Sequence, residues 1–375
     1  MRKRVKLDFR IGLLGAAFCM LGPHLSATAN GPLVTFDAPG AGAGVGQGTF
    51  VNGINSGGAI VGWYVDTNNV SHGFVRTHDG RIVTFDAPGA GTAAGQGTFA
   101  FGMNSGQEVT GSYIDDKNIH HGYLRTPLGK FTAIDVPGAG TGAGQGTYGD
   151  NVNAHGEISG RYDDANGVPH AFVRSRDGAI TGFEVPGASM LPGQGTQTSS
   201  MYGLNNAGWF AGLYVDSSGV WRAYLRAPEG PVIGFDAPGA GTAANQGTVA
   251  DCVSENMQIS GWIIDSNGVN RGYLRSSDGR FIGIDVPGAG TGAGQGTIVA
   301  SVNSAGAIAG FYIDANNRVH GFSRFHGGPF SIFDAPGAGT GAWQGTFAVG
   351  NNMAGTVTGY FVDGKDVAHG FLRKP

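Results

Sequence analysis

The chain has 375 residues, of which 71 are glycine and only 13% are charged. The glycines follow no period of three, which excludes a collagen-like chain. The formal net charge of −4 argues against nucleic acid as a partner, and no apolar run is long enough to span a bilayer.

The first element is a segment that resembles a secretory signal. Basic residues at Arg2 to Lys6 precede a short apolar run from Ile11 to Gly22, and Ala27 to Ala29 offer small residues for cleavage. We therefore expect residues 1–29 to be removed, residues 30–375 to form a single domain, and the protein to be secreted, either extracellular or periplasmic.

Removal of this signal changes the charge and cysteine content. The signal contains five of the 23 basic residues and one of the 27 acidic residues, which leaves 18 and 26 and a net charge of −8. Cys252 is the one cysteine left, so no intrachain disulfide is expected. The sequence contains neither a nucleic-acid-binding charge pattern nor a membrane-inserting segment, and we expect a monomer.

One motif then recurs seven times, at intervals of 49 residues with a single interval of 52. Repetition of this regularity indicates a repeat architecture. The proline of each Pro-Gly-Ala stands at Pro39, Pro88, Pro137, Pro186, Pro238, Pro287 and Pro336. The longer interval contains three extra residues between Gln194 and Asn205.

Each copy predicts four short strands separated by turns. In the first copy the strands are expected at residues 49–55, 59–66, 70–77 and 81–86, and the turns contain Gly, Asn and Asp. Four antiparallel strands in about 49 residues are typical of one β-propeller blade. The sequence thus predicts an all-β fold, a seven-bladed β-propeller of four-stranded blades.

The two ends of the repeat array complement each other. Residues 33–37 resemble a fourth strand without the first three, and the C-terminal copy, ending at Arg373, lacks a fourth strand. We expect the N-terminal strand to complete the last blade and close the ring, because closure leaves no open blade edge. An open solenoid is the alternative, although the end caps typical of solenoids are missing.

The repeat resembles that of the HAF family of predicted extracellular proteins. The resemblance depends on residues 54–62 and on the following His72-Gly73-Phe74, and the triplet His170-Ala171-Phe172 matches the family name. It covers nearly all of residues 30–375 and implies an exported repeat protein. It supplies no established catalytic residues.

Charged residues recur at fixed places in all copies. An acid ends the second and the fourth strand of each copy, and His or Arg begins the third, as in Asp66, Asp86 and His72. An enzyme needs one set of catalytic groups, whereas seven sets are better explained as locks that hold the blades together. We therefore interpret these residues as structural.

The glycine-rich connectors do not predict a cofactor site. No helix follows them to bind a phosphate, and no lysine follows the glycines. The Asp-rich turns, such as Asp66 to Asn69, lack the density of carboxylates that calcium requires. We expect no cofactor and no metal.

Departures from the repeat are the candidate binding residues. They are expected on the face that carries the connectors between blades and the turns between second and third strands. Exposed tryptophan beside polar groups suits stacking on a sugar or capture of a peptide. The predicted ligand-binding residues are Met190, Leu191, Tyr202, Trp221, Arg222 and Trp343.

We therefore expect a non-catalytic binding or scaffold protein that recognises a carbohydrate or a protein. The alternative is a secreted lyase or hydrolase that acts on polysaccharide at a single site near the central channel. The unrepeated ionisable residues available for such a site are His120, His155, Asp150, Asp251 and Glu255. No motif connects them, so no catalytic residue is predicted. A purely structural surface protein is a third possibility.

Overall fold

The protein is an all-β molecule. In a computed structural model, residues 31–199 and 202–375 are described, and they form 28 strands and no helix. The predicted signal peptide lies outside the described residues. Within them there is no helix long and apolar enough to cross a bilayer. The prediction of an all-β fold is confirmed.

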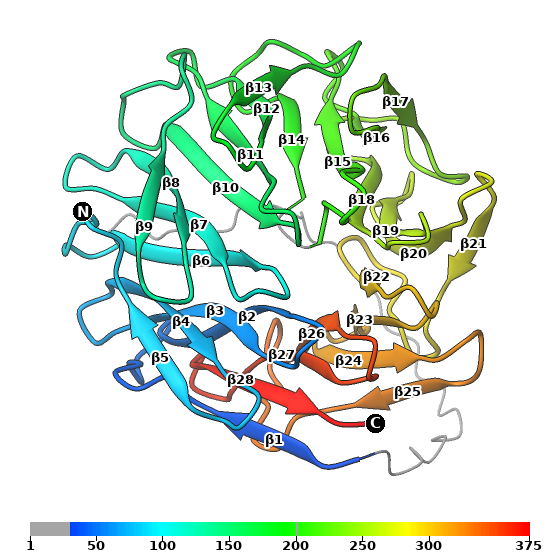
Figure 1. The fold of residues 1–375 in the computed structure, drawn as a ribbon. Coiled ribbons are helices and arrows are strands. Elements are labelled where there is room, and N and C mark those ends of the chain that lie inside the picture. Colours follow the sequence, from blue (N-terminus) through cyan, green and yellow to red (C-terminus); the bar gives the residue numbers. More distant parts are fainter. Residues whose placement is uncertain (1–30, 200–201) are drawn as a thin grey trace.

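The strands follow one another in sets of four that repeat along the chain (Figure 1). We number these sets 1 to 7 in chain order, and call the members of each set its first, second, third and fourth strand. The first strands are β2 (Gly48–Ile54), β6 (Gly97–Met103), β10 (Gly146–Val152), β14 (Gly195–Thr198), β18 (Gly247–Val253), β22 (Gly296–Val302) and β26 (Gly345–Asn351). The second strands are β3 (Ile60–Val65), β7 (Val109–Ile114), β11 (Ile158–Asp163), β15 (Phe210–Val215), β19 (Ile259–Ile264), β23 (Ile308–Ile313) and β27 (Val357–Val362).

The third and fourth strands complete each set. The third strands are β4 (Ser71–Arg76), β8 (His120–Arg125), β12 (Pro169–Arg174), β16 (Trp221–Arg226), β20 (Asn270–Arg275), β24 (Val319–Arg324) and β28 (Ala368–Arg373). The fourth strands are β5 (Ile82–Phe85), β9 (Phe131–Ile134), β13 (Ile180–Phe183), β17 (Val232–Phe235), β21 (Phe281–Ile284), β25 (Phe330–Phe333) and, at the N-terminal end, β1 (Leu33–Phe36). In set 1 the observed strands lie within the predicted ranges or one residue outside them.

Short polar turns join the strands of a set. In the turn between β3 and β4, the Asp66 carboxylate accepts hydrogen bonds from the backbone N–H groups of Asn68 and Val70, both at 2.8 Å. Asn69 adopts a left-handed conformation with φ of 63°, which asparagine tolerates better than most residues. The repeated acid at the end of the second strand therefore shapes this turn.

The Gln-Gly-Thr triplet before each first strand joins neighbouring sets. Gly97 lies directly against the backbone of Ser71 in the preceding set, where a Cβ atom would collide with the Ser71 carbonyl. The Gln96 carbonyl accepts a hydrogen bond from the Ser71 N–H at 2.9 Å. The threonine hydroxyl of each triplet accepts one from a backbone N–H eleven residues earlier, at 2.8–3.1 Å. The triplets thus bind neighbouring backbone.

Strand β1 pairs with the C-terminal strand. Its residues run antiparallel to β28, from Leu33 opposite Arg373 to Phe36 opposite Gly370. The two strands lie side by side in Figure 1, one blue and one red. Across the same pair, His369 Nδ1 lies 2.9 Å from an oxygen of Asp37. Strand β1 therefore lies beside the third strand of set 7, in the position that the fourth strand holds in the other sets.

A second series of contacts runs between the turns that follow the first strands. Asn55 donates a side-chain hydrogen bond to the Asn104 carbonyl in the next set at 3.1 Å, and Asn352 donates one to the Asn55 carbonyl at 3.4 Å. Corresponding bonds join the other sets except where Ser254 replaces asparagine. There Asn256 donates to the Ser304 carbonyl instead, at 3.0 Å. We call these turns the asparagine turns.

Candidate functional site

The repeated charges form compact clusters within each set. His72 Nδ1 lies 2.8 Å from Asp86, and its Nε2 lies 3.7 Å from Asp66, so one imidazole bridges the ends of two strands. His121, His170, His320 and His369 bridge two acids in the same way. The expectation that the histidine lies across from both acids is confirmed. Its recurrence in successive sets fits a structural role.

Hydrogen bonding keeps Asp66, the acid of the turn between β3 and β4, ionised. Burial by itself raises the pKa of the Asp66 carboxyl. The backbone N–H groups of Val70 and Asn68, together with nearby His72, outweigh that effect and hold the pKa below its usual value. Asp66 is therefore a fixed acceptor at neutral pH and not a proton donor.

The connectors between sets carry exposed apolar side chains at three of the predicted positions. Met190 is 60% exposed and Leu191 55% exposed in the connector before β14, and Trp343 is 45% exposed in the connector before β26. The two connectors belong to sets 4 and 7, so these residues do not form one cluster. Of the three, Trp343 is the one aromatic side chain.

Trp343 occupies a backbone position that suits glycine. Its φ is 65°, in the left-handed region. The corresponding residues of the other connectors also have positive φ, and they are Gly46, Gly95, Gly144, Gly193, Asn245 and Gly294. A Cβ atom added at Gly46, Gly95 or Gly144 would meet nothing within 4 Å, so a side chain at this position points into open space. Trp343 combines an unfavourable backbone conformation with an exposed indole.

A second departure from the repeat lies beside Trp343 and was missed in the sequence. Arg318 stands where the other copies have Val or Ile, and its guanidinium binds Asp334 at 2.8 Å. Its Nε is buried and has no hydrogen-bond partner in the described part of the chain. Backbone bonds from Trp343 to Asn317, at 2.6 Å, and from Val319 to Gln344, at 2.9 Å, hold the two segments together. Comparing the copies at the position of Arg318, which is Val or Ile in the others, would have found this departure.

Trp221 and Arg222 are bound more tightly into the fold than the sequence suggests. The Trp221 N–H donates to the Gln246 carbonyl of the next set at 2.8 Å, and its side chain is half-buried. Arg222 Nε binds Asp216 at 2.8 Å, and its Nη1 binds Asp236. Arg222 thus takes the place that histidine has in set 1. The residue before this cation differs between sets and is buried in most of them, as at Val319 and Ala368.

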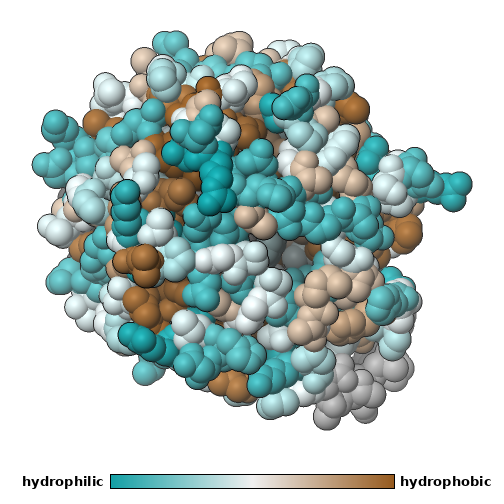
Figure 2. All heavy atoms as spheres, in the orientation of Figure 1, coloured by the Kyte–Doolittle hydropathy of each residue, from teal (hydrophilic) through white to brown (hydrophobic). Residues whose placement is uncertain are grey.

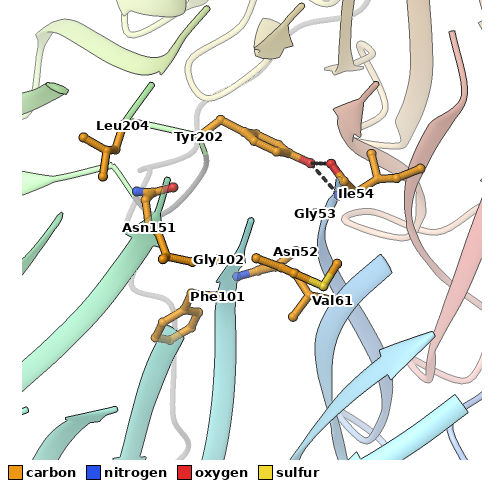
Figure 3. A pocket seen from close by; sticks show the side chains of 11 residues that line it. Asn52, Gly53, Ile54, Val61, Phe101, Gly102, Asn151, Tyr202 and Leu204 are labelled. Carbon is orange, nitrogen blue, oxygen red and sulfur yellow. Dashed lines mark hydrogen bonds between the residues drawn. The ribbon is translucent and has the colours of Figure 1, made fainter. Parts of the chain in front are cut away.

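Tyr202 does not lie with the other predicted residues. The prediction that it lies on the face that carries the connectors is wrong. Its hydroxyl accepts a hydrogen bond from the Ile54 N–H at 2.6 Å and lies 3.3 Å from the Ile54 carbonyl, in set 1 (Figure 3). It also packs beside Gly53 and Gly350. Strand β14 ends at Thr198 and pairs with β15 without the bulge that other first strands have, for example between Val51 and Gly53. Tyr202 reaches from set 4 to set 1 across the centre of the molecule.

Of the residues considered for an enzyme, the structure brings His120 and Asp150 near Tyr148 and Arg161, whereas Asp251 and Glu255 have other partners. Asp150 binds the Thr198 hydroxyl, and Asp251 accepts a hydrogen bond from Ser199 at 2.6 Å. His120 stacks on Tyr148 with ring centroids 4.3 Å apart, and burial lowers its pKa to about 4. Glu255 accepts from the Asn206 N–H at 3.1 Å. The described residues contain no group of three or more His, Cys, Asp and Glu that could hold a metal.

Asp251 gives a prediction for the pH dependence of stability. Burial raises the pKa of its carboxyl to about 7, above the unfolded value of 3.8. The stability that the neutral carboxyl contributes is therefore present below about pH 4 and is lost as the pH rises through about 7. We expect Asp251→Asn to be more stable than the parent at about pH 8, by up to about 4 kcal/mol, and similar to it at about pH 4.

Denaturant unfolding at several pH values measures this difference. Asparagine retains an acceptor for Ser199, so the variant changes the charge and little else. Asp116→Asn, at an exposed acid, is the matched control and should not change the pH dependence. A parent and Asp251→Asn with parallel stability profiles would contradict the buried, neutral carboxyl.

These features define the fold class. An all-β chain whose four-stranded sets lie around a common centre is β-propeller-like (Figure 1). Its structure resembles the BP39L lectin from Burkholderia pseudomallei, with a TM-score of 0.55 and 12% identity over 86% of this chain and 96% of the lectin. AofleA from Arthrobotrys oligospora has a TM-score of 0.48 and 14% identity over 87% of this chain and 94% of its own. At such identities the resemblance shows the fold alone. No protein-family model matches the sequence, and no curated protein matches it.

Proposed function

We propose that the protein is an exported, non-catalytic propeller of seven blades that binds carbohydrate on its connector face. The proposal combines three parts: the closed ring, the binding residues and the chemistry of the ligand. A lyase or hydrolase would need a cluster of unrepeated acids and bases open to a substrate, whereas Asp150, which lies near Tyr148, is buried and bonded to the Thr198 hydroxyl.

Pairing at the ends of the chain supports the closed ring. Strand β1 completes set 7 beside β28, and the Ala368 N–H donates to the Gln47 carbonyl of set 1 at 2.9 Å. Asn352 bonds to Asn55 across the same junction. Export follows from the proposed signal in residues 1–29, and the recurring His-Gly-Phe segments support the proposal that the chain belongs to the HAF family. A closed ring has no free blade edge, which suits a monomer.

The exposure and the left-handed backbone conformation of Trp343 are the main support for the proposed binding site. A bulky residue in the left-handed region lowers stability by about 1–2 kcal/mol relative to glycine, and the other connectors avoid this loss with glycine or asparagine. An exposed indole retained at a strained position points to a function outside the fold. On the rigid rim of a blade it would lose little conformational entropy when a ligand binds.

The groups around Trp343 suit a sugar. The indole offers a flat apolar face for the C–H groups of a pyranose ring, and Arg318 and Asp334 offer donors and acceptors for its hydroxyls. His320 extends the same polar group, with its Nδ1 3.0 Å from Asp334. The similar protein from Burkholderia pseudomallei is a lectin, which supports carbohydrate over peptide only by analogy of fold. Met190, Leu191, Trp221 and Arg222 would form a further, separate contact area on set 4.

Trp343→Gly tests this proposal because its two expected effects have opposite signs. The variant should be more stable than the parent by about 1 kcal/mol, since glycine accepts the left-handed backbone. It should also lose most of its affinity for the best ligand found on a glycan array, by about 1–3 kcal/mol, because the indole is the proposed anchor. Calorimetry measures both quantities.

Asn245→Gly is the matched control, because Asn245 occupies the same connector position in set 5 with φ of 62°. It should leave binding unchanged. If Trp343→Gly binds the ligand with full affinity, the proposal of a binding site at the connector before β26 is wrong. If the best ligand is a peptide and not a glycan, the proposed site stands and the proposal that it binds carbohydrate is wrong.

A further inference from the structure

Polar residues that the repeat does not have gather where sets 2 and 3 meet. Figure 2 shows one face of the molecule, on which hydrophilic residues predominate and apolar residues form small, separate patches. Exposed apolar surface therefore does not point to a further binding site on the visible face. The unrepeated polar residues at the junction are Arg161 and Asp163 in β11, Tyr148 in β10 and His120 in β8.

Arg161 and Asp163 stand where the other sets have uncharged residues. The position of Asp163 is Val or Ile in the other six copies. The residues at the position of Arg161 in those copies are Trp63, Ser112, Leu213, Trp262, Phe311 and Tyr360. Tyr148 lies opposite Arg161 in the pair of β10 and β11, and Gly146 lies opposite Asp163. The two charged side chains therefore share the face of the sheet that bears Tyr148.

The Arg161 guanidinium is held against an aromatic ring and has no polar partner. Its central carbon lies 4.4 Å from the centre of the Tyr148 ring, and the His120 ring lies 4.3 Å from the same centre. Arg161 is half-buried and forms no hydrogen bond and no ion pair with any described residue. Its nitrogen atoms are not fully buried, so they are accessible to a ligand.

The nearby acids do not supply the missing partner. Asp150 is buried and binds the Thr198 hydroxyl, and Asp163 lies beside the Tyr148 hydroxyl. Burial raises the pKa of both carboxyls, to about 6 for Asp150, and outweighs the opposite effect of Arg161. Neither acid is therefore closely paired with the guanidinium.

His120 adds an accessible donor beside the guanidinium. Burial, followed by the nearby charge of Arg161, lowers the pKa of His120 to about 4, so the imidazole is neutral at pH 7. Its Nδ1 is buried and cannot reach a ligand, whereas its Nε2 is not fully buried and has no partner among the described residues. A guanidinium can donate two parallel hydrogen bonds to a carboxylate, which makes this anion the best match for Arg161.

We propose that the junction of sets 2 and 3 binds the carboxylate of a small organic acid, either an acidic sugar or an acid without a sugar ring. The carboxylate pairs with the Arg161 guanidinium, His120 Nε2 donates to it, and the Tyr148 ring holds the guanidinium in place. This site is separate from Trp343, which lies in the connector before set 7, so it does not depend on the proposed carbohydrate site.

Titration of a chain of residues 30–375 with D-glucuronate, acetate and glucose tests the proposal. The measurement is the change in the backbone amide NMR signals of His120 and Arg161. We expect glucuronate to bind in the millimolar range, and glucose, which lacks the carboxylate, not to shift these signals. If acetate binds about tenfold more weakly than glucuronate, the ligand is an acidic sugar, and if it binds equally, the site recognises a carboxylate alone.

Two variants of Arg161 test its role. Arg161→Leu copies the residue of set 4 and should weaken glucuronate binding about tenfold, because the guanidinium is lost. It should fold like the parent, since Arg161 forms no hydrogen bond with a described residue. Arg161→Lys retains the charge without the planar donors and should weaken binding about threefold.

Arg280→Leu is the matched control, because it changes the net charge equally at an exposed arginine that pairs with Asp278 at 3.2 Å. It should bind glucuronate like the parent. Undiminished binding by Arg161→Leu, equal weakening by Arg280→Leu, equal binding of glucose, or no binding of either acid would overturn the proposal. The last result would mean that the Arg161 guanidinium binds only water.

Discussion

Removal of residues 30–39 is expected to lower the unfolding free energy by about 5 kcal/mol or more, enough to leave a marginal or aggregating protein. The deletion takes away β1 and exposes the backbone edge of β28 along its whole pairing from Leu33 to Phe36. An unpaired edge strand is a template for pairing with other chains. The loss should therefore appear both in stability and in oligomeric state.

Strand β1 contributes more than its backbone pairing. Phe36 packs edge-to-face against Phe74 of set 1 at 6.2 Å, and the Arg76 guanidinium lies 5.0 Å from the Phe36 ring. Leu33 packs against the apolar core of set 7, and Asp37 pairs with His369. The strand thus joins sets 7 and 1, and its removal opens both contacts at once.

Thermal unfolding and gel filtration of the deletion variant provide the measurement. The control is a chain that begins at Gly31 and retains β1, which should behave like the mature protein. A deletion variant that is monomeric and as stable as this control would contradict closure by the N-terminal strand and reopen the solenoid alternative.

Repetition made the strands predictable from the sequence. The same turn residues recur at the same places, so an error in one copy is corrected by six others. The acid at the position of Asp66 predicts a turn in each copy. The four strands of set 1 lie within one residue of their expected positions. The pairing of β1 with β28 follows from the incomplete copies at the two ends of the chain.

The unrepeated residues were harder to place because their contacts are distant in the chain. Tyr202 bonds to Ile54, 148 residues away, and no local pattern encodes such a contact. The available signal was the site of the insertion, between Gln194 and Asn205, in the copy whose first strand lacks the bulge of the others. Val319 and Ala368 occupy a position that varies between copies and are nevertheless buried, so variability alone does not indicate exposure to solvent.

Replacement of Tyr202 is expected to have the second largest effect on stability. Tyr202→Ala should lower the unfolding free energy by about 3–5 kcal/mol, because Tyr202 lines two neighbouring cavities at the centre, of about 50 Å³ and about 270 Å³, and loss of its ring would enlarge them. Tyr202→Phe retains the ring and removes only the hydroxyl. It should cost about 1–3 kcal/mol, since the Ile54 N–H would be left without its acceptor.

Hydrogen exchange of the Ile54 amide tests whether Tyr202 connects sets 4 and 1 across the centre or only packs within set 4. In Tyr202→Phe the Ile54 amide should exchange faster than in the parent, although it lies 148 residues from the substitution. Tyr148→Phe is the matched control, because the Tyr148 hydroxyl donates to the Gly144 carbonyl at 3.2 Å and also bonds to Asp163, both within its own set and connector. It should lower stability by about 1–3 kcal/mol, as Tyr202→Phe does, but leave Ile54 protected. If Ile54 remains protected in Tyr202→Phe, the hydroxyl does not bind set 1 in solution, and Tyr202 only fills space in set 4.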